Sequence, residues 1–212
     1  MPQTELGFGR LDGAQAASHG EELQALHAEV YADPPYRRDE DPAAFARRFA
    51  VQRRQPGFVL AEARHGGYLV GYAAGMPLRP STSWWRALTT PLPDEVTAEH
   101  PGRTFALVEL LVRASWRRQG IGRRLHDLVL AGRTEERATL TVLPAATPAQ
   151  NAFQSGGWRK VGRARDLEPG APVPATTGPA TTGPASTGPA STVPTSTVSD
   201  VLIRPLPLPA AG

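Results

Sequence analysis

A segment rich in arginine and glycine follows the most apolar stretch of the sequence. Residues 104–112 read TFALVELLV, and Arg117, Gly120 and Gly122 come after them in the spacing R-x-x-G-x-G. Glycine lets a backbone approach a ligand closely. The predicted start of a helix at this point adds N–H groups and a dipole that favour an anion. The segment therefore predicts a pyrophosphate site, and a glycine-containing helix start with solvated arginines is the alternative.

Glu109 is the only charged residue within the apolar run 105–112. A carboxylate at such a position can act as a general base, and burial beside a cofactor would raise its pKa towards useful values. Alternation along a strand predicts one face for Glu109 and three apolar residues: Phe105, Leu107 and Leu111. Two other roles stay open, a structural ion pair with an arginine or an anchor for the ammonium group of a substrate.

Composition narrows the possible classes of protein. The 212 residues include 23 Lys and Arg, 20 Asp and Glu, and no cysteine, which excludes disulfides and thiolate chemistry. The basic residues are dispersed among acids, so we expect no nucleic-acid partner. No run approaches the roughly 20 apolar residues of a membrane span, and the first residues lack the apolar core of a secretory signal. We expect a cytoplasmic protein that does not bind membranes.

Helix and strand signals alternate along residues 1–167. The predicted helices begin at three capping signals: Ser18 with Glu21, Asp41 with Pro42, and Thr147 with Gln150. A further helix is predicted over 120–133. Predicted strands cover 58–64, 68–76, 104–112, 138–143, 158–165 and 198–203. Residues 77–102 form a connection long enough to be a functional loop or an irregular excursion. The five histidines show no metal-ligand spacing, and we interpret them as ordinary surface or helix residues without a metal site.

The composition changes after residue 167. Residues 168–212 hold ten Pro and five Gly, and from 176 they repeat TTGPA or STGPA. Such a segment cannot bury enough apolar surface to order itself. We predict a domain over 1–167, a low-complexity insertion over 168–197, a terminal strand over 198–206 and a flexible tail over 207–212. A glycosylated or partner-binding tract is the alternative for the insertion.

The chain resembles the GNAT superfamily of acyl-CoA N-acyltransferases. The residues R-x-x-G-x-G at 117–122 match that family's [RQ]-x-x-G-x-[GA] signature, and blocks 104–130 and 138–162 resemble the strands and helices around it. The resemblance covers about 5–167 with a final strand at 198–203. It implies an α+β fold, a mixed and mostly antiparallel sheet that is flanked by helices and splayed between its fourth and fifth strands. It also predicts that the strands over 158–165 and 198–203 pair as a hairpin.

The resemblance also implies an activity, the transfer of an acetyl group from acetyl-CoA to a primary amine by direct attack. Glu109 would remove the amine proton. The pantetheine arm would pair with the backbone at the end of the fourth strand: Leu111, Val112 and Arg113. The pyrophosphate would sit on a set of N–H groups: Arg118, Gln119, Gly120, Ile121, Gly122 and Arg123. The enzyme would be a monomer or a homodimer.

Phe153 departs from the family pattern. Many members place a tyrosine on the last helix to protonate the leaving thiolate, and the turn Gly157-Trp158 aligns Phe153 with that tyrosine beside the cofactor. Water or another group would then supply the proton. Two alternatives stay open: a non-catalytic coenzyme A-binding relative, and an acyltransferase that uses another acyl-CoA.

The resemblance implies a small-molecule or peptide amine as the acceptor and does not identify it. Tyr36, Trp84 and Trp85 are the candidate aromatic residues for its site, because an aromatic wall with nearby carboxylates suits a cationic amine. The tryptophans could equally serve to fold the long connection onto the core.

Overall fold

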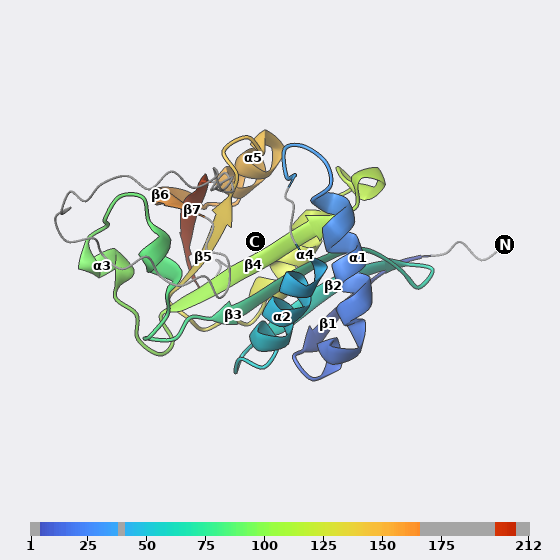
Figure 1. The fold of residues 1–212 in the computed structure, drawn as a ribbon, viewed down its shortest axis with the longest axis horizontal. Coiled ribbons are helices and arrows are strands. Elements are labelled where there is room, and N and C mark those ends of the chain that lie inside the picture. Colours follow the sequence, from blue (N-terminus) through green and yellow to red (C-terminus); the bar gives the residue numbers. More distant parts are fainter. Residues whose placement is uncertain (1–4, 38–40, 166–197, 207–212) are drawn as a thin grey trace, which may run out of the picture.

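Seven strands form one sheet within residues 5–37, 41–165 and 198–206, which are the residues that the computed structural model describes (Figure 1). The spatial order is β1-β2-β3-β4-β5-β7-β6. The strands are β1 (Leu6–Asp12), β2 (Val59–His65), β3 (Tyr68–Pro77), β4 (Thr104–Val112), β5 (Arg137–Val142), β6 (Arg159–Arg165) and β7 (Val198–Pro205). Of these neighbours only β4 and β5 run parallel. The predicted mixed, mostly antiparallel sheet is confirmed.

Helices cover both faces of the sheet (Figure 1). α1 (Gly20–Val30) and α2 (Pro42–Gln52) pack on one face over β2 and β3, and α4 (Ile121–Leu130) packs on the other. α4 buries an apolar stripe at helical spacing, which includes Ile121, Leu125 and Val129. The remaining elements are η1 (Gln15–His19), η2 (Trp84–Ala87), α3 (Asp94–Thr97), η3 (Ala114–Trp116) and α5 (Thr147–Ser155).

The three predicted capping signals have different outcomes. Asp41 caps α2 as predicted, because its carboxylate accepts from the N–H of Ala43 at 3.0 Å. Ser18 does not cap α1, since residues 15–19 already form a turn of 3-10 helix. Thr147 lies inside α5, and the amide of Gln150 donates instead to Leu143 O. Both capping boxes are therefore wrong, although both helices exist.

β4 and β5 separate after a short paired stretch. Thr104, Phe105 and Ala106 lie opposite residues 137–139, and pairing between the two strands ends there. β4 nevertheless continues to Val112 and β5 to Val142. The predicted splay between the fourth and fifth strands is confirmed, and it leaves one edge of the second half of β4 open.

β7 lies between β5 and β6 and pairs antiparallel with both. Its side chains Val201 and Leu202 are each 1% exposed. Arg165 of β6 lies opposite Val198 of β7, so residues 166–197 join two residues that face each other across the sheet. The predicted pairing of these strands is confirmed. The repeat and the predicted tail at 207–212 lie outside the described residues.

Asp200 of β7 connects this hairpin to α5. Its Oδ1 lies 2.6 Å from Lys160 Nζ and 3.2 Å from Arg163 Nε, and its Oδ2 accepts from Gln150 at 3.1 Å. Burial raises the pKa of Asp200, but the bonds and charge of Lys160, with Arg163 and Gln150, outweigh burial and hold the pKa below its usual value. Asp200 is therefore an ionised link between two strands and a helix.

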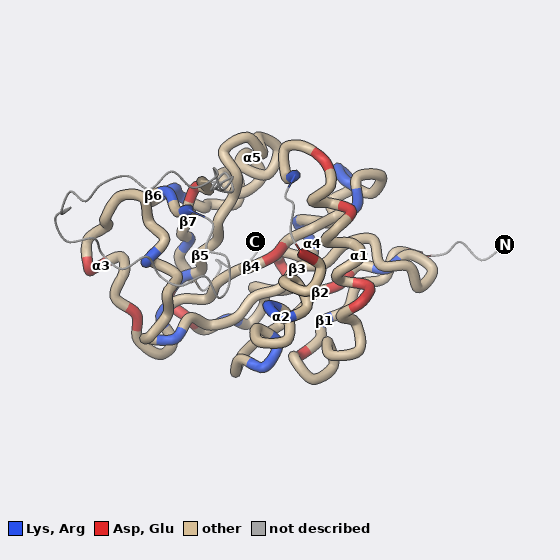
Figure 2. The backbone as a smooth tube through the Cα atoms, viewed as in Figure 1, with Lys and Arg blue, Asp and Glu red and all other residues tan. Residues whose placement is uncertain are grey.

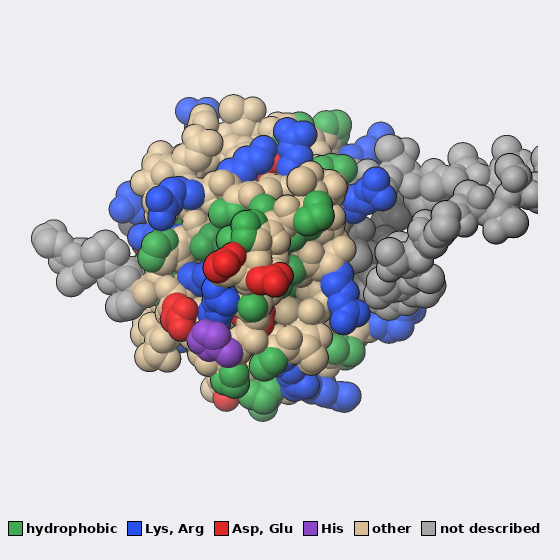
Figure 3. Space-filling view, turned by 90° about the vertical axis from the view of Figure 1, so that its left-hand side faces the viewer, with side chains coloured by type: hydrophobic (Ala, Val, Ile, Leu, Met, Phe, Trp, Pro, Cys, Tyr) green, Lys and Arg blue, Asp and Glu red, His purple; other side chains and the backbone are tan. Residues whose placement is uncertain are grey.

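The long connection between β3 and β4 covers the outer edge of β6. The N–H of Thr89 donates to Arg163 O at 2.8 Å, and Leu88 forms a bridge with Ala164. Figure 3 shows the end of the molecule that carries α3, where hydrophobic and acidic side chains lie in the centre and most basic ones lie around them. The connection is thus an irregular excursion that protects a sheet edge.

Candidate active site

β4 carries one extra residue opposite β3. Ala74 lies opposite Glu109, and the next residue of β3, Gly75, lies opposite Leu107. Val108 is therefore the additional residue of a β-bulge. A bulge of this kind bends the strand and changes the side to which the following residues point.

The bulge corrects the predicted placement of Glu109. Phe105 and Leu107 pack in the apolar cluster on the α4 side, whereas Leu111 packs with α1 and α2. Glu109 contacts residues of α1 and α2, so it shares a face with Leu111 but not with the other two. Strict alternation is wrong here because Val108 shifts its phase by one residue.

Two basic side chains approach the Glu109 carboxylate. His27 Nε2 on α1 lies 3.7 Å from Glu109 Oε1, and Arg48 Nη2 on α2 lies 4.0 Å from the same atom. Arg48 also donates to His27 Nε2 at 3.2 Å. Figure 2 shows a basic stretch of α2 close to an acidic stretch of β4. The contacts suit a general base, and they suit a structural ion pair equally well.

His27 lies on a helix, as interpreted, but it is not a surface residue. His27 is 4% exposed, and its ring contacts Tyr31 and Phe45. A sequence signal existed for this burial, because His27 lies at helical spacing from the buried Leu23 and Leu26 and so belongs to the apolar stripe of α1. The stripe could not indicate that the His27 ring lies close to the Glu109 carboxylate.

Only alternate residues of β4 direct their backbone N–H and C=O groups to its open edge. Arg113 donates its backbone N–H to Val70 O at 2.9 Å, so Leu111 also bonds to β3. The backbone groups of Leu110 and Val112 therefore point to the opposite edge, where β5 has separated. Of the three residues predicted to pair with pantetheine, Val112 faces this edge, and Leu111 and Arg113 face β3. Leu110, which the prediction did not name, also faces this edge.

The glycine segment starts α4 beside this edge. Gly120 has a φ of +79°, a left-handed conformation that glycine adopts without strain. The first bond of the helix runs from Arg124 N–H to Gly120 O at 3.0 Å. The N–H groups of Ile121, Gly122 and Arg123 precede it and have no acceptor inside the helix. The arrangement thus presents N–H groups for an anion.

Gly122 brings the helix start against the open edge of β4. A Cβ on Gly122 would lie 3.7 Å from the Leu110 side chain and 3.8 Å from the Val112 side chain. The side chains of Arg118, Gln119 and Arg123 are exposed around it. The structure therefore places the predicted phosphate loop and the predicted pantetheine edge side by side.

Tyr36 lies close to the same loop. Its ring is half-buried against both apolar clusters of the sheet, and the guanidinium of Arg117 lies 5.7 Å from the ring centroid. Arg117 also donates from Nε to Val112 O at 3.0 Å. Tyr36 belongs to the connection from α1 to α2 and thus lies close to the end of β4.

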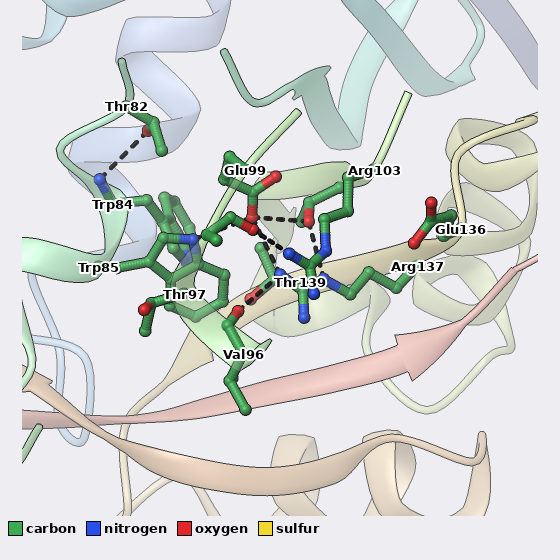
Figure 4. Close-up of polar contacts among 12 residues, drawn as sticks. Thr82, Trp84, Trp85, Val96, Thr97, Glu99, Arg103, Glu136, Arg137 and Thr139 are labelled. Carbon is green, nitrogen blue, oxygen red and sulfur yellow. Dashed lines mark hydrogen bonds and ion pairs between the residues drawn. The ribbon is translucent and has the colours of Figure 1, made fainter. Parts of the chain in front are cut away.

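Trp85 lies at the other end of β4 (Figure 4). Its Nε1 donates to Glu99 Oε1 at 2.9 Å, and Glu99 also accepts from Thr104 at 2.8 Å and from Arg137 at 3.0 Å. Thr104 begins β4, five residues before Glu109, a span of about 15 Å along a strand. The structure does not bring Trp85 to Glu109. Trp85 instead anchors the long connection between β3 and β4. Trp84 is half-buried and packs against the apolar cluster that contains Trp85.

Within the residues that the structure describes, no group of His, Asp and Glu is arranged to hold a metal ion. No helix there is long and apolar enough to cross a membrane.

Comparison with known families decides the assignment. The family model of the GNAT acetyltransferases matches residues 21–158. The chain belongs to the GNAT acetyltransferase family. The match contains α1, α2, the bulged strand and the glycine segment, so the geometry above lies inside the GNAT domain. No curated protein sequence gives a match.

The solved structures that this chain resembles include three that are distant from it in sequence. A GNAT-family acetyltransferase from Staphylococcus aureus Mu50 is 14% identical at a TM-score of 0.59, with 96% of this chain and 100% of that chain covered. The ribosomal-protein-S18-alanine N-acetyltransferase from Escherichia coli is 12% identical at 0.58, with 97% of each covered. The PaiA N-acetyltransferase from Thermoplasma acidophilum, in complex with coenzyme A, is 9% identical at 0.54, with 95% and 99% covered. This likeness shows the fold.

Phe153 occupies an aromatic cluster between α5 and α4 of the GNAT domain. Its ring centroid lies 5.9 Å from that of Trp158 and 6.4 Å from that of His126. Trp158 Nε1 donates to His126 Nε2 at 3.1 Å, and His126 Nδ1 lies 3.0 Å from Asp127 Oδ1. His126 is 9% exposed, so it too is a buried helix residue.

The buried state of His126 predicts a stability that depends on pH. Burial lowers its pKa below the usual 6.5, and the bond to Asp127 opposes this only in part. The unfolded chain therefore binds more protons than the folded one as the pH falls below 6.5, and the free energy of unfolding falls with it. We expect the melting temperature to decrease between pH 7.5 and 5.5. Glutamine at 126 keeps an acceptor for Trp158 and should flatten this decrease.

Thermal melts of the wild type and His126→Gln across that range check the prediction. His100→Gln is the matched control, because His100 is exposed. A decrease that is equally steep in all three proteins would assign it to other groups.

Proposed function

We propose that the chain is an N-acetyltransferase that moves an acetyl group from acetyl-CoA to a primary amine. One observation carries the proposal: the open edge of β4 leads directly to the N–H groups at the start of α4, with Gly122 against Leu110 and Val112. A strand edge next to an anion site suits a long thioester that ends in a pyrophosphate. The family assignment supports acyl transfer in general.

In this proposal each part of the coenzyme meets a different group of backbone atoms. The pyrophosphate accepts hydrogen bonds from Ile121, Gly122 and Arg123. The pantetheine arm follows the backbone of Leu110 and Val112 at the open edge of β4. The thioester then lies in the opening between β4 and β5.

The proposed chemistry needs a neutral amine. Glu109 takes a proton from the ammonium group, and the amine nitrogen then attacks the thioester carbonyl. The C–S bond breaks as the amide forms and the nitrogen loses its second proton, and water supplies a proton to the leaving thiolate, so coenzyme A leaves as a thiol. Transfer is direct, so the lack of cysteine in the chain is no obstacle.

Release of free thiol from acetyl-CoA tests the function. The panel of acceptors should include aminoglycosides, polyamines, amino acids and peptide N-termini. Release that depends on one class of amine is the expected result. Faster thiol release from a longer acyl-CoA than from acetyl-CoA would mean that the protein uses another acyl donor for the same reaction.

Phe153 favours a second candidate function, a coenzyme A-binding protein without catalysis. A phenyl ring has no proton to give to a leaving thiolate. Binding of acetyl-CoA without thiol release across the whole panel would support this candidate and contradict acetyl transfer.

A carboxylate at Gly120 should abolish coenzyme binding. A Cβ there meets no atom within 4 Å, so Gly120→Asp should fold, and Asp tolerates the left-handed conformation better than most residues. The new charge would repel the pyrophosphate. Acetyl-CoA at a hundred times its Kd should stabilise the wild type by about 2.7 kcal/mol, and we expect this gain to be lost.

Gly120→Asn is the matched control, since it has the same shape without the charge. The measurement is the shift in melting temperature with acetyl-CoA. An undiminished shift in folded Gly120→Asp would show that the pyrophosphate binds elsewhere.

A further inference from the structure

The side chain of Arg117 already occupies part of the edge that the proposed pantetheine site uses. Its Nε donates to Val112 O at 3.0 Å, and its guanidinium carbon lies 5.7 Å from the centre of the Tyr36 ring. These two contacts hold the guanidinium between the end of β4 and the connection from α1 to α2. Because Arg117 is exposed, another donor can replace it without any change in the core.

The bond from Arg117 takes one of the few polar groups at the open edge of β4. Leu110 and Val112 direct their backbone N–H and C=O groups away from β3, and β5 has separated from this part of β4. Pantetheine contains two amide groups, so an arm that follows the strand has N–H donors for these carbonyls. Arg117 therefore holds an acceptor that a pantetheine amide would use.

Arg117 also has donors left for a phosphate. A guanidinium has five N–H donors, and among the described residues only the Nε of Arg117 makes a hydrogen bond. Arg117 precedes Ile121, the first of the three N–H groups in the proposed pyrophosphate site, by four residues. A guanidinium can bind two phosphate oxygens at once, and charge on both partners makes these bonds stronger than a bond to a neutral carbonyl. A phosphate at the start of α4 would thus attract Arg117 away from Val112.

We propose that Arg117 makes binding at the open edge of β4 depend on phosphate. In the free protein Arg117 covers Val112 O. When the pyrophosphate of the coenzyme binds at the start of α4, Arg117 moves to the phosphate, and an amide N–H of pantetheine takes its place. Val112 O has a donor in both states, so the exchange leaves no carbonyl unsatisfied.

This exchange gives Arg117 a role in the choice of the donor. A thioester that contains pantetheine but no phosphate must compete with Arg117 for Val112 O and has no group that draws the guanidinium away. Acyl-CoA supplies both the amide and the phosphate. The inference rests on the function proposed above, and it makes Arg117 a residue that selects acyl-CoA over simpler thioesters.

The affinities of Arg117→Met for pantetheine and for coenzyme A test the proposal. Methionine cannot donate a hydrogen bond, so the Kd for pantetheine should fall about two- to tenfold, the effect of one hydrogen bond that no longer competes. The Kd for coenzyme A should rise, because the stronger bond to phosphate is lost. Arg124→Met is the matched control, since it removes an equal charge from an exposed side chain in the first turn of α4. It should leave the Kd for pantetheine unchanged.

The NMR signal of the Arg117 Nε–H reports the exchange directly. Its absence in Arg117→Met identifies it, and it should shift when coenzyme A saturates the wild type. A signal that stays in place while coenzyme A is bound would overturn the proposal. An unchanged Kd for pantetheine in folded Arg117→Met would also overturn it, because Val112 O would then accept from both partners at once. A wild type that does not bind coenzyme A would contradict the proposed function, and this inference with it.

Discussion

A chain that ends at residue 170 is expected not to unfold as one cooperative unit, whereas a chain that lacks only residues 172–195 is expected to melt at least as high as the full chain. The truncation removes β7 from between β5 and β6. β6 then loses its strand partner among the described residues, and the sheet loses the buried Val201 and Leu202. Removal of one large buried side chain alone commonly destabilises by 2–5 kcal/mol.

The internal deletion keeps β7 and shortens only its connection. Closure of a flexible loop depends on the logarithm of its length, so the deletion should stabilise by about 1 kcal/mol. Melting curves and the yield of soluble protein check both shortened chains against the full one. Equal melting of the truncated and the deleted chain would mean that β7 does not dock in the sheet.

Replacement of Glu109 by glutamine should reduce kcat by a factor of about 10²–10⁴, the usual loss for a general base. Glutamine keeps the shape and polarity of the side chain but accepts no proton near neutral pH. Binding of acetyl-CoA should persist, because its proposed partners are backbone groups of β4 and α4. Stopped assays with a responsive amine give kcat, and the shift in melting temperature reports binding.

Glu62→Gln is a closely matched control for this variant. The Glu62 side chain is 12% exposed, against 13% for Glu109, and it also has an arginine and a histidine as neighbours, Arg64 at 3.0 Å and His19 at 3.9 Å. It lies on β2, away from the open edge. A similar loss in both variants would indicate general damage to the sheet, and unchanged turnover of Glu109→Gln would remove Glu109 from the chemistry.

Local signals in the sequence predicted most of the sheet and the glycine segment at the start of α4. The structural role of Gly120 and Gly122 could be predicted from nearby residues, because it depends on the strand before them and the helix after them. The strand 198–203 was also predictable from its own apolar run after the repeat. Such features need no knowledge of distant partners.

The features that could not be predicted depend on contacts between distant segments. The bulge at Val108 exists only in the register between β3 and β4, so alternation along β4 alone gave Glu109 the wrong neighbours. The partners of His27 come from α2 and β4. Trp85 is oriented by Glu99 and Arg137. The pair Trp84-Trp85 in the sequence could not predict these contacts.

The position of β7 also has a consequence for the time course of folding. The ribosome must add residues 166–197 after β6 is complete before any residue of β7 can pair. At about 5–20 residues per second this takes roughly two to six seconds. During that interval β5 and β6 exist without the strand that joins them, and their open edges can pair wrongly with other chains. The length of the repeat thus acts as a delay, and expansion or loss of TTGPA units would change how long each newly made molecule is vulnerable to aggregation.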